Sequence, residues 1–300
     1  MKLLYLFVFF VIPVFAGHSF ASDQTPIQEK SEGLANTAAK VTEHIYSENP
    51  LDLTIATLPA NYHGHDPEDL YRRLNARKGR EAIGEFETTE AYRARVQSEA
   101  TKPILGTLNT SSIFACEIAT RVATYDADRQ VMHVTTSLFH VFEGLMGKAV
   151  KEKRSLVCKR ISKRDSYIGT NAYGASVEVT KSTHYEYGLA VGNYFHFPIR
   201  KPLTYYGEQF KSLGSYEQEL FAFDLKMDPT TAMKTKENLR LLAIFKLQPP
   251  FTLEGSLYLK PTFDSPLEYF TRYFYINAEL LEILLYDAKT GEIFDKLKPS

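Results

Sequence analysis

The sequence predicts a mainly β protein of the α+β class, with two packed antiparallel β units of sandwich type and a few short helices. Three observations lead to this fold class. From about residue 108 onward, apolar residues recur with the period of two that is typical of strands. These segments are rich in Val, Ile, Thr and Phe, and residues of turn composition separate them. Before residue 108, the apolar spacing and the capping residues indicate helices instead.

The first 21 residues have the pattern of a cleavable secretory signal. Lys2 supplies a positive charge, Leu3–Ala16 is an almost unbroken apolar run, and Ser19 and Ala21 suit a cut before Ser22. The alternative is a transmembrane anchor, but a span needs about 20 apolar residues and this run ends earlier. We therefore expect a periplasmic or secreted protein with no transmembrane segment in its mature chain.

Three helices are predicted before the first strand. An apolar stripe with steps of three and four residues runs through Gly33–Tyr46. A second helix begins after Asp66, because this side chain can cap the free amides and Pro67 suits the first helical position. A third helix begins near Thr88 or Thr89. By the same capping argument, Asp228-Pro229 starts another short helix further along the chain.

The predicted strands follow one another to the end of the chain. They are Ile113–Thr124, Val131–Val141, Ser155–Ile161, Ala175–Lys181, Tyr185–Val191, Leu239–Leu247, Phe274–Tyr286 and Glu292–Leu297. Pro249-Pro250 is expected to close the strand before it. Tyr125-Asp126-Ala127 and Tyr286-Asp287-Ala288 each end a strand and precede a turn, which would suit two related hairpins.

These elements divide the chain into four parts. Residues 1–21 are the signal, and 22–66 form a polar leader and an amphipathic helix. Residues 67–192 form a helical entry and the first β unit, and 193–300 form the second β unit. The second unit opens with the aromatic-dense stretch Tyr194–Phe223, which we expect to pack in the core or between the units. A sugar or peptide groove is the alternative use, but the chain contains no Trp to stack on a sugar.

Cys116 and Cys158 are the two cysteines of the chain. Export to an oxidising compartment and an even number of cysteines predict a disulfide between them. Two buried thiols are the alternative, because spacing alone does not bring the sulfur atoms together. A bridge would stabilise the fold by about 4 kcal/mol on the chain-entropy account.

The charge balance argues against a general attraction for nucleic acid. The formal net charge is −1, so we expect no nucleic-acid partner. One stretch, from Lys148 to Arg164, is nevertheless strongly basic. It suits either a solvated strand face or peripheral contact with an anionic envelope surface. The residues expected to make such contact are Lys151, Lys153, Arg154, Lys159, Arg160, Lys163 and Arg164.

His63, His65 and Asp66 are the candidate metal ligands. Two imidazoles and a carboxylate are groups that Zn²⁺ accepts, although a site needs three or four ligands. No His-Glu-x-x-His arrangement accompanies them, and Asp66 is already the expected helix cap. We therefore favour an exposed loop that enters a helix, and we expect no metal or other cofactor.

A string at the start of the third predicted helix carries a resemblance to a known family. Gly84-Glu85-Phe86-Glu87-Thr88, followed by Tyr92 and Arg95, resembles a string that recurs in exported bacterial proteins of uncharacterised function. Tyr167–Gly174 and Tyr286–Lys296 are similar to later parts of the same proteins. The resemblance implies that Gly84–Ser300 is one structural unit, and it implies no activity, ligand or catalytic residue.

No short catalytic motif stands out, since Gly-x-Ser-x-Gly and Cys-x-x-Cys patterns are missing. We therefore expect a non-enzymatic protein that binds or scaffolds another component of the cell envelope. The alternative is a secreted hydrolase whose site is assembled from distant residues such as Asp126, Asp128 and His133. Asp126 and Asp128 would share one face of a strand, as an acid/base or Ca²⁺ pair requires, but turn chemistry explains them equally well.

Overall fold

The computed structural model describes residues 46–78, 83–140, 153–200 and 219–300. The predicted signal, the polar leader and nearly all of the first predicted helix lie outside these residues. The same is true of Lys151 in the basic stretch, and of residues 201–218 in the aromatic-dense stretch.

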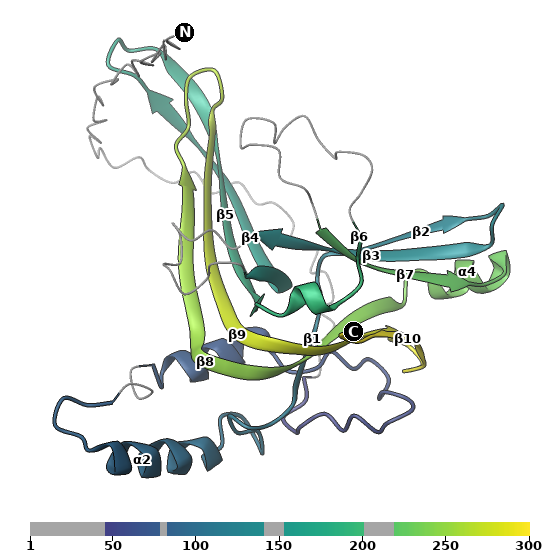
Figure 1. Ribbon diagram of the computed structural model, residues 1–300. Coiled ribbons are helices and arrows are strands. Elements are labelled where there is room, and N and C mark those ends of the chain that lie inside the picture. The colour runs from purple at the N-terminus through teal and green to yellow at the C-terminus, as the bar shows by residue number, and fades with distance from the viewer. Residues whose placement is uncertain (1–45, 79–82, 141–152, 201–218) are drawn as a thin grey trace, which may run out of the picture.

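The described chain forms one curled sheet, which Figure 1 shows. Its strands are β1 (Phe114–Glu117), β2 (Arg121–Asp126), β3 (Val131–His140), β4 (Arg154–Thr170), β5 (Ser176–Val191), β6 (Ile199–Arg200), β7 (Glu219–Lys226), β8 (Leu239–Leu259), β9 (Leu267–Asp287) and β10 (Ile293–Leu297). The order is β1-β8-β9-β5-β4-β3-β7-β6, with β10 beside β9 and β2 beside β3. The predicted fold class, mainly β with a few short helices, is confirmed.

One strand pair departs from the antiparallel arrangement. β5 and β9 run parallel, from Thr180 beside Leu267 to Val191 beside Ala278. This pairing and that of β7 with β3 join strands from either side of the boundary expected at residue 192. The division into two β domains stays a prediction, while the hydrogen bonding makes the strands parts of one sheet.

The helices begin where their capping residues predicted. They are α1 (Pro67–Asn75), α2 (Thr89–Thr101) and α4 (Pro229–Thr235), with a 3-10 turn, η2, over Tyr194–His196. The side chains of Asp66, Thr88 and Asp228 accept hydrogen bonds from the first free backbone amides of α1, α2 and α4. The predicted caps Asp66 and Asp228 are confirmed, and α2 begins at Thr89, as expected for a start near Thr88 or Thr89. α1 buries Leu70 and Leu74 against the sheet, whereas α2 buries none of its residues.

Several strand boundaries differ from the sequence prediction. β4 runs to Thr170 instead of Ile161, β9 begins at Leu267 instead of Phe274, and β7 was not among the expected strands. Ala175–Lys181 and Tyr185–Val191 are parts of the single strand β5. The predicted strand Ile113–Thr124 is divided into β1 and β2, because Ile118 and Ala119 donate to carbonyls of β8 and β4 as the chain crosses over. The expected end of β8 at Pro249-Pro250 is wrong. The pairing of β8 with β9 has an irregularity between Leu247 and Thr252, so no hydrogen bond of this ladder requires an N–H at either proline.

The lower part of the sheet is buried on both faces. On β8, Leu241, Ala243 and Phe245 belong to the main core, whereas the alternate residues Leu242 and Ile244 belong to a second cluster. Side chains alternate between the faces of a strand, so these two clusters lie on opposite sides of the sheet. Residues 46–66, which we call the entry segment, cover the second face with Leu51, Leu58 and Tyr62, whose side chains are buried in that second cluster.

The upper part of the sheet is a four-stranded arm that projects from this body (Figure 1). We define the arm as residues 160–185 of β4 and β5 with their turn, and residues 253–273 of β8 and β9 with theirs. The β4–β5 pairing runs unbroken to Thr170 beside Ser176, and the β8–β9 pairing runs to Leu259 beside Tyr269. Both hairpin turns therefore lie at the free end of the arm.

Candidate functional site

His63, the first candidate metal ligand, pairs with a residue that the sequence did not single out. Its Nδ1 contacts a carboxylate oxygen of Glu117, at the end of β1. Arg240 Nε on β8 lies 3.2 Å from the other oxygen of Glu117. The ring of Tyr46 meets the His63 ring edge-on. Groups of the chain itself thus engage both oxygens of Glu117, and the cluster ties the entry segment to the sheet.

His65, the second candidate, is buried between two backbone segments. The Ala115 N–H donates to its Nδ1 over 2.8 Å, and its Nε2 lies 2.9 Å from the Asn49 carbonyl oxygen. The Ala115 carbonyl oxygen also lies 3.0 Å from Nδ1. A carbonyl only accepts, so Nε2 donates to Asn49, and a neutral ring with that proton can accept from the Ala115 N–H. Burial lowers the pKa of His65 and favours this neutral form. Both nitrogens are occupied by backbone groups.

Asp66, the third candidate, caps α1 and accepts from Glu68 N over 3.0 Å. Lys159 on β4 lies 3.5 Å from the same carboxylate and 2.6 Å from Glu68. Burial alone would lower the pKa of Lys159, but the Glu68 hydrogen bond and the Asp66 charge raise it. The three candidate ligands therefore face three different sets of partners. Among the described residues, no three His, Cys, Asp or Glu side chains are grouped so that they could hold a metal ion.

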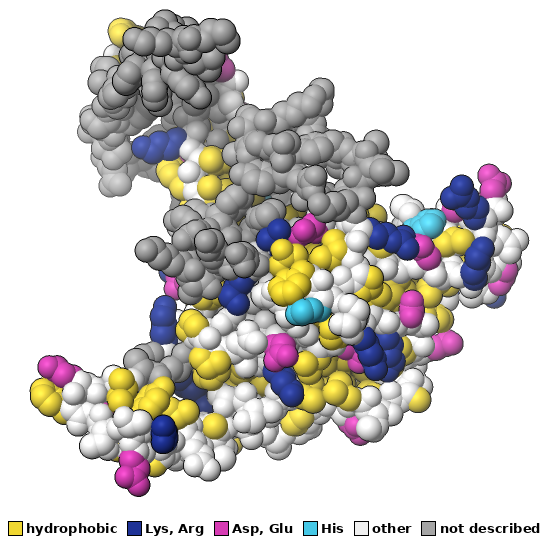
Figure 2. Space-filling view, in the orientation of Figure 1, with side chains coloured by type: hydrophobic (Ala, Val, Ile, Leu, Met, Phe, Trp, Pro, Cys, Tyr) yellow, Lys and Arg dark blue, Asp and Glu magenta, His cyan; other side chains and the backbone are white. Residues whose placement is uncertain are grey.

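Three residues of the basic stretch, Arg154, Lys159 and Arg160, pair with acids on other elements. Arg154 bonds Glu219 over 2.6 Å and also lies over the ring of Tyr194. Arg160 pairs with the buried carboxylate of Glu186 over 2.8 Å. On the face in Figure 2, side chains of both charges are interspersed over the described surface. Of the other described basic residues, Lys163 and Arg164 on β4 are exposed, whereas Lys153 is partly buried, and burial lowers its pKa.

The residues expected for a hydrolase, Asp126, Asp128 and His133, make separate contacts in the described structure. Asp126 accepts from Arg129 N over 3.0 Å and so holds the β2–β3 turn, the turn role that its sequence context predicted. Asp128 is exposed in the same turn. His133 lies 2.7 Å from Asp224 on β7. Arg200 also contacts Asp224, and its hydrogen bonds are the main reason why the pKa of this carboxyl is lowered.

Cys116 and Cys158 form a disulfide, as predicted. The strands that carry them, β1 and β4, are not hydrogen-bonded neighbours, because three strands separate them in the order of the sheet. The sheet curls until they meet, with the two Cα atoms 6.1 Å apart. The hydrogen bond from Ala119 N to Val157 O, 2.8 Å long, joins the same two parts of the chain.

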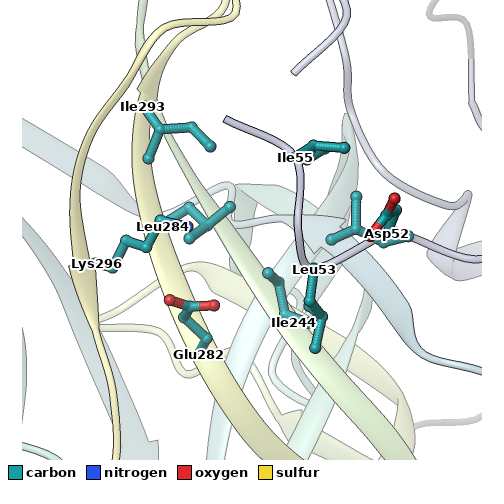
Figure 3. Close-up of a pocket in the computed structure, with 9 residues that line it drawn as sticks. Asp52, Leu53, Ile55, Ile244, Glu282, Leu284, Ile293 and Lys296 are labelled. Atoms are coloured by element: carbon teal, nitrogen blue, oxygen red, sulfur yellow. The ribbon is translucent and has the colours of Figure 1, made fainter. Parts of the chain in front are cut away.

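A small cavity lies where the entry segment crosses β8, β9 and β10 (Figure 3). Its lining includes Leu53, Ile244, Glu282 and Lys296. The volume open to water-sized groups is about 10 Å³, which accommodates about one water molecule. Glu282 is nearly buried, and its charge partner is Lys298, 3.6 Å away. The cavity is too small for a metabolite, so it does not mark a ligand site.

The string that carries the family resemblance forms the start of α2. Thr88 caps the helix, and Arg95 binds both carboxylate oxygens of Glu87, each over 2.7 Å. The Arg95 hydrogen bonds lower the pKa of Glu87 to about 2. Glu87 also accepts from Gly84 N over 3.1 Å. The string therefore has a local structural role at the helix start.

The free end of the arm gathers exposed apolar side chains. Seven of the fifteen exposed large apolar residues in the described chain are found there. They are Tyr167, Ile168, Tyr173, Tyr258, Leu259, Phe263 and Leu267. Sequence reasoning missed this group, because strands far apart in sequence assemble it. One feature of the sequence could have indicated this group, because residues 166–177 contain no charged side chain. We take the arm end as the candidate functional site.

The comparisons with known proteins add no function. No protein-family model and no curated protein matches the chain. A solved structure of a mutant single-stranded DNA binding protein from Thermus aquaticus is 10% identical and covers 63% of this chain and 93% of its own, with a TM-score of 0.10. A likeness of that degree carries no argument. Within the described residues, none of the helices combines the length and the apolar character that crossing a membrane requires.

Proposed function

We propose that this chain is an exported protein of the cell envelope, which binds another envelope component through the free end of its arm and catalyses no reaction. The observation that carries the proposal is the concentration of exposed apolar residues at the end of a projecting arm. Exposed apolar groups that are contiguous on a protein surface mark sites of interaction with proteins or membranes. The disulfide and the signal-like first 21 residues support an oxidising compartment.

Cell fractionation and crosslinking test this proposal. The full-length chain is expressed with a photoreactive residue at Tyr173 or Phe263 on the arm, or at Met233 on α4 as an exposed control. We expect a processed chain outside the cytoplasm, with adducts from the two arm positions and none from the control. A chain that keeps its first 21 residues and stays in the cytoplasm would overturn the proposal, as would equal crosslinking from all three positions.

A hydrolase remains the alternative function. The residues first expected for it are spread over separate contacts, and the fold brings together two pairs of a histidine with a carboxylate, His63 with Glu117 and His133 with Asp224. Activity screening of the purified chain against ester, peptide and glycoside substrates decides between the two functions. Turnover that the substitution His63→Gln abolishes, while the fold is kept, would favour the hydrolase.

A further inference from the structure

The two turns lie at the same end of the arm, and the β4–β5 turn reaches further, since β5 begins at Ser176, four residues before Thr180 pairs with Leu267. β5 and β9 are parallel neighbours, and the pairing begins with Thr180 beside Leu267. The backbone N–H of Thr180 donates to the Pro266 carbonyl over 2.9 Å. The β4–β5 turn and the β8–β9 turn therefore end the same piece of sheet. The strand from Arg160 to Thr170 is roughly 35 Å long. The turns therefore project well beyond Lys159, where β4 contacts α1.

The first turn holds an aromatic side chain outward. Tyr173 is 96% exposed, and Ile168, two residues before the end of β4 at Thr170, is 67% exposed. Asn171 fixes the turn, since its side-chain oxygen accepts from Tyr173 N and from Ala175 N, both over 3.0 Å. Gly174 has a φ of +82°, which favours glycine at this position. The exposed ring is thus presented by a hydrogen-bonded turn.

The turns satisfy most of their own backbone groups. In residues 171–175, four of the five N–H groups donate within the turn. In the second turn, Thr262 N donates to Ser265 O and Leu267 N donates to the same carbonyl, while Pro261 and Pro266 have no N–H. Backbone groups without partners resist transfer from water to a less polar medium. Turns that bond internally avoid most of that cost.

The charge pattern agrees with a lipid environment. Residues 166–177 carry no charge, and the second turn carries one Lys and one Asp, Lys260 and Asp264. Below the turns, Lys181 lies 3.4 Å from Glu268, which also accepts a hydrogen bond from the Tyr167 hydroxyl. Tyrosine and other aromatic residues favour the boundary between lipid headgroups and acyl chains, where one end of the side chain is apolar and the other meets water.

We infer that the arm end inserts shallowly into the interfacial region of a lipid bilayer, with Tyr173 and Phe263 as the leading side chains. This inference rests on the proposed function, because it names the envelope component that the arm binds. The contact is apolar, and the two charges of its turns, Lys260 and Asp264, cancel, whereas Glu178 beside Ile168 and the exposed Lys163 and Arg164 lie further down the arm. Binding therefore depends little on anionic lipid or on salt, unlike the peripheral contact expected from the basic stretch.

Tryptophan reporters test the inference, because the natural chain contains no Trp and each variant carries a single emitter. The variants are Tyr173→Trp, Phe263→Trp and the control Met233→Trp, which is exposed on α4. They are mixed with vesicles of phosphatidylcholine alone, and of phosphatidylcholine with phosphatidylglycerol. We expect a blue shift and quenching by brominated lipid for the two arm reporters with both vesicles, and no change for the control.

A loss-of-binding variant completes the test. Tyr173→Ser combined with Phe263→Ser is expected to weaken vesicle binding by about tenfold or more, from the apolar area removed. Salt between 50 and 500 mM is expected to change binding by less than about twofold. Both residues are exposed, so the variant should fold, and far-ultraviolet circular dichroism checks this. Unchanged binding of the double variant, or equal signals from all three reporters, overturns the inference.

The outcome also separates this inference from the proposed function. Absence of vesicle binding together with arm crosslinks to an envelope protein rejects the lipid partner and keeps the function. Self-association through the arm, seen by analytical ultracentrifugation and lost in the double variant, also rejects it. A cytoplasmic, unprocessed chain rejects the function itself, whatever the vesicles show.

Discussion

The hydroxyl of Tyr286 on β9 donates a 2.5 Å hydrogen bond to the backbone carbonyl of Tyr62 in the entry segment. Tyr286 is fully buried, and burial raises the pKa of its hydroxyl, which keeps the donor proton in place. We expect Tyr286→Phe to lower the free energy of unfolding by about 1–3 kcal/mol, because the Tyr62 carbonyl loses its donor in a buried place. Urea denaturation followed by circular dichroism measures the change. Tyr173→Phe, at a fully exposed ring, is the control, and equal losses for the two variants would contradict the expectation.

The disulfide should contribute a large share of the stability. It closes a loop with a sequence separation of 42 residues between β1 and β4, for which chain entropy gives about 4 kcal/mol. The double variant with Cys116→Ser and Cys158→Ser should unfold at a correspondingly lower urea concentration. Dithiothreitol should shift the natural chain by the same amount and leave the double variant unchanged. An unfolding midpoint of the natural chain that stays the same with and without dithiothreitol would contradict this role.

His65 should make the fold sensitive to mild acid. Burial lowers its pKa in the folded chain, so at low pH the unfolded chain binds this proton more readily. Its contribution to stability is therefore complete above the ordinary pKa of about 6.5 and is lost as the pH falls below that value, by at most about 1.4 kcal/mol per pH unit. Urea midpoints measured between pH 7.5 and 5 follow the loss. His65→Gln should flatten this dependence, whereas His133→Gln, at a partly exposed ring, should leave it in place.

The parts of the fold that the sequence predicted are the local ones. Asp66, Thr88 and Asp228 begin their helices where expected, because a cap acts within three residues of itself. The turns after Tyr125 and Tyr286 are also alike. Asp126 accepts from Arg129 N, and Asp287 accepts from Lys289 N and Thr290 N. Hydrogen bonds of this kind join residues two or three positions apart, so the local sequence predicts them.

The arrangements that the sequence did not predict join distant positions. β5 and β9 pair in parallel across more than 80 residues, as Thr180 beside Leu267 illustrates. His63 meets Glu117 over 54 positions, and no spacing rule relates the two. The exposed apolar residues of the arm end come from two hairpins, β4–β5 and β8–β9, which are far apart in the sequence. The end of β8 was predicted wrongly at Pro249-Pro250 for a related reason. The irregularity that accommodates the two prolines arises in the pairing of β8 with β9, which is a contact between distant residues.

Substitution of Asp66 should separate its capping role from a metal-binding role. Asp66→Ala removes the acceptor of the Glu68 N–H and should cost about 1 kcal/mol of stability. Asp66→Asn keeps an acceptor oxygen and should cost less. Thermal unfolding with and without added Zn²⁺ measures both. Asp228→Ala at the equivalent position of α4 is the matched control. A Zn²⁺-dependent rise in the stability of the natural chain, lost in Asp66→Asn, would restore the metal interpretation.

The basic residues of β4 should protect an open strand edge from aggregation. Among the described residues, β3 pairs with β4 at Arg154 and Ser155 alone, and Val157 accepts from Ala119 N, so the side of β4 away from β5 is open beyond Val157. Charged side chains on an open edge hinder pairing with another chain. We expect Lys163→Leu with Arg164→Leu to lower the protein concentration at which light scattering begins by several-fold, with little change in the unfolding midpoint. Lys234→Leu with Lys236→Leu, which adds the same apolar groups on α4, should aggregate no more than the natural chain. If both double variants aggregate alike, added surface apolarity explains the effect and the edge has no special part in it.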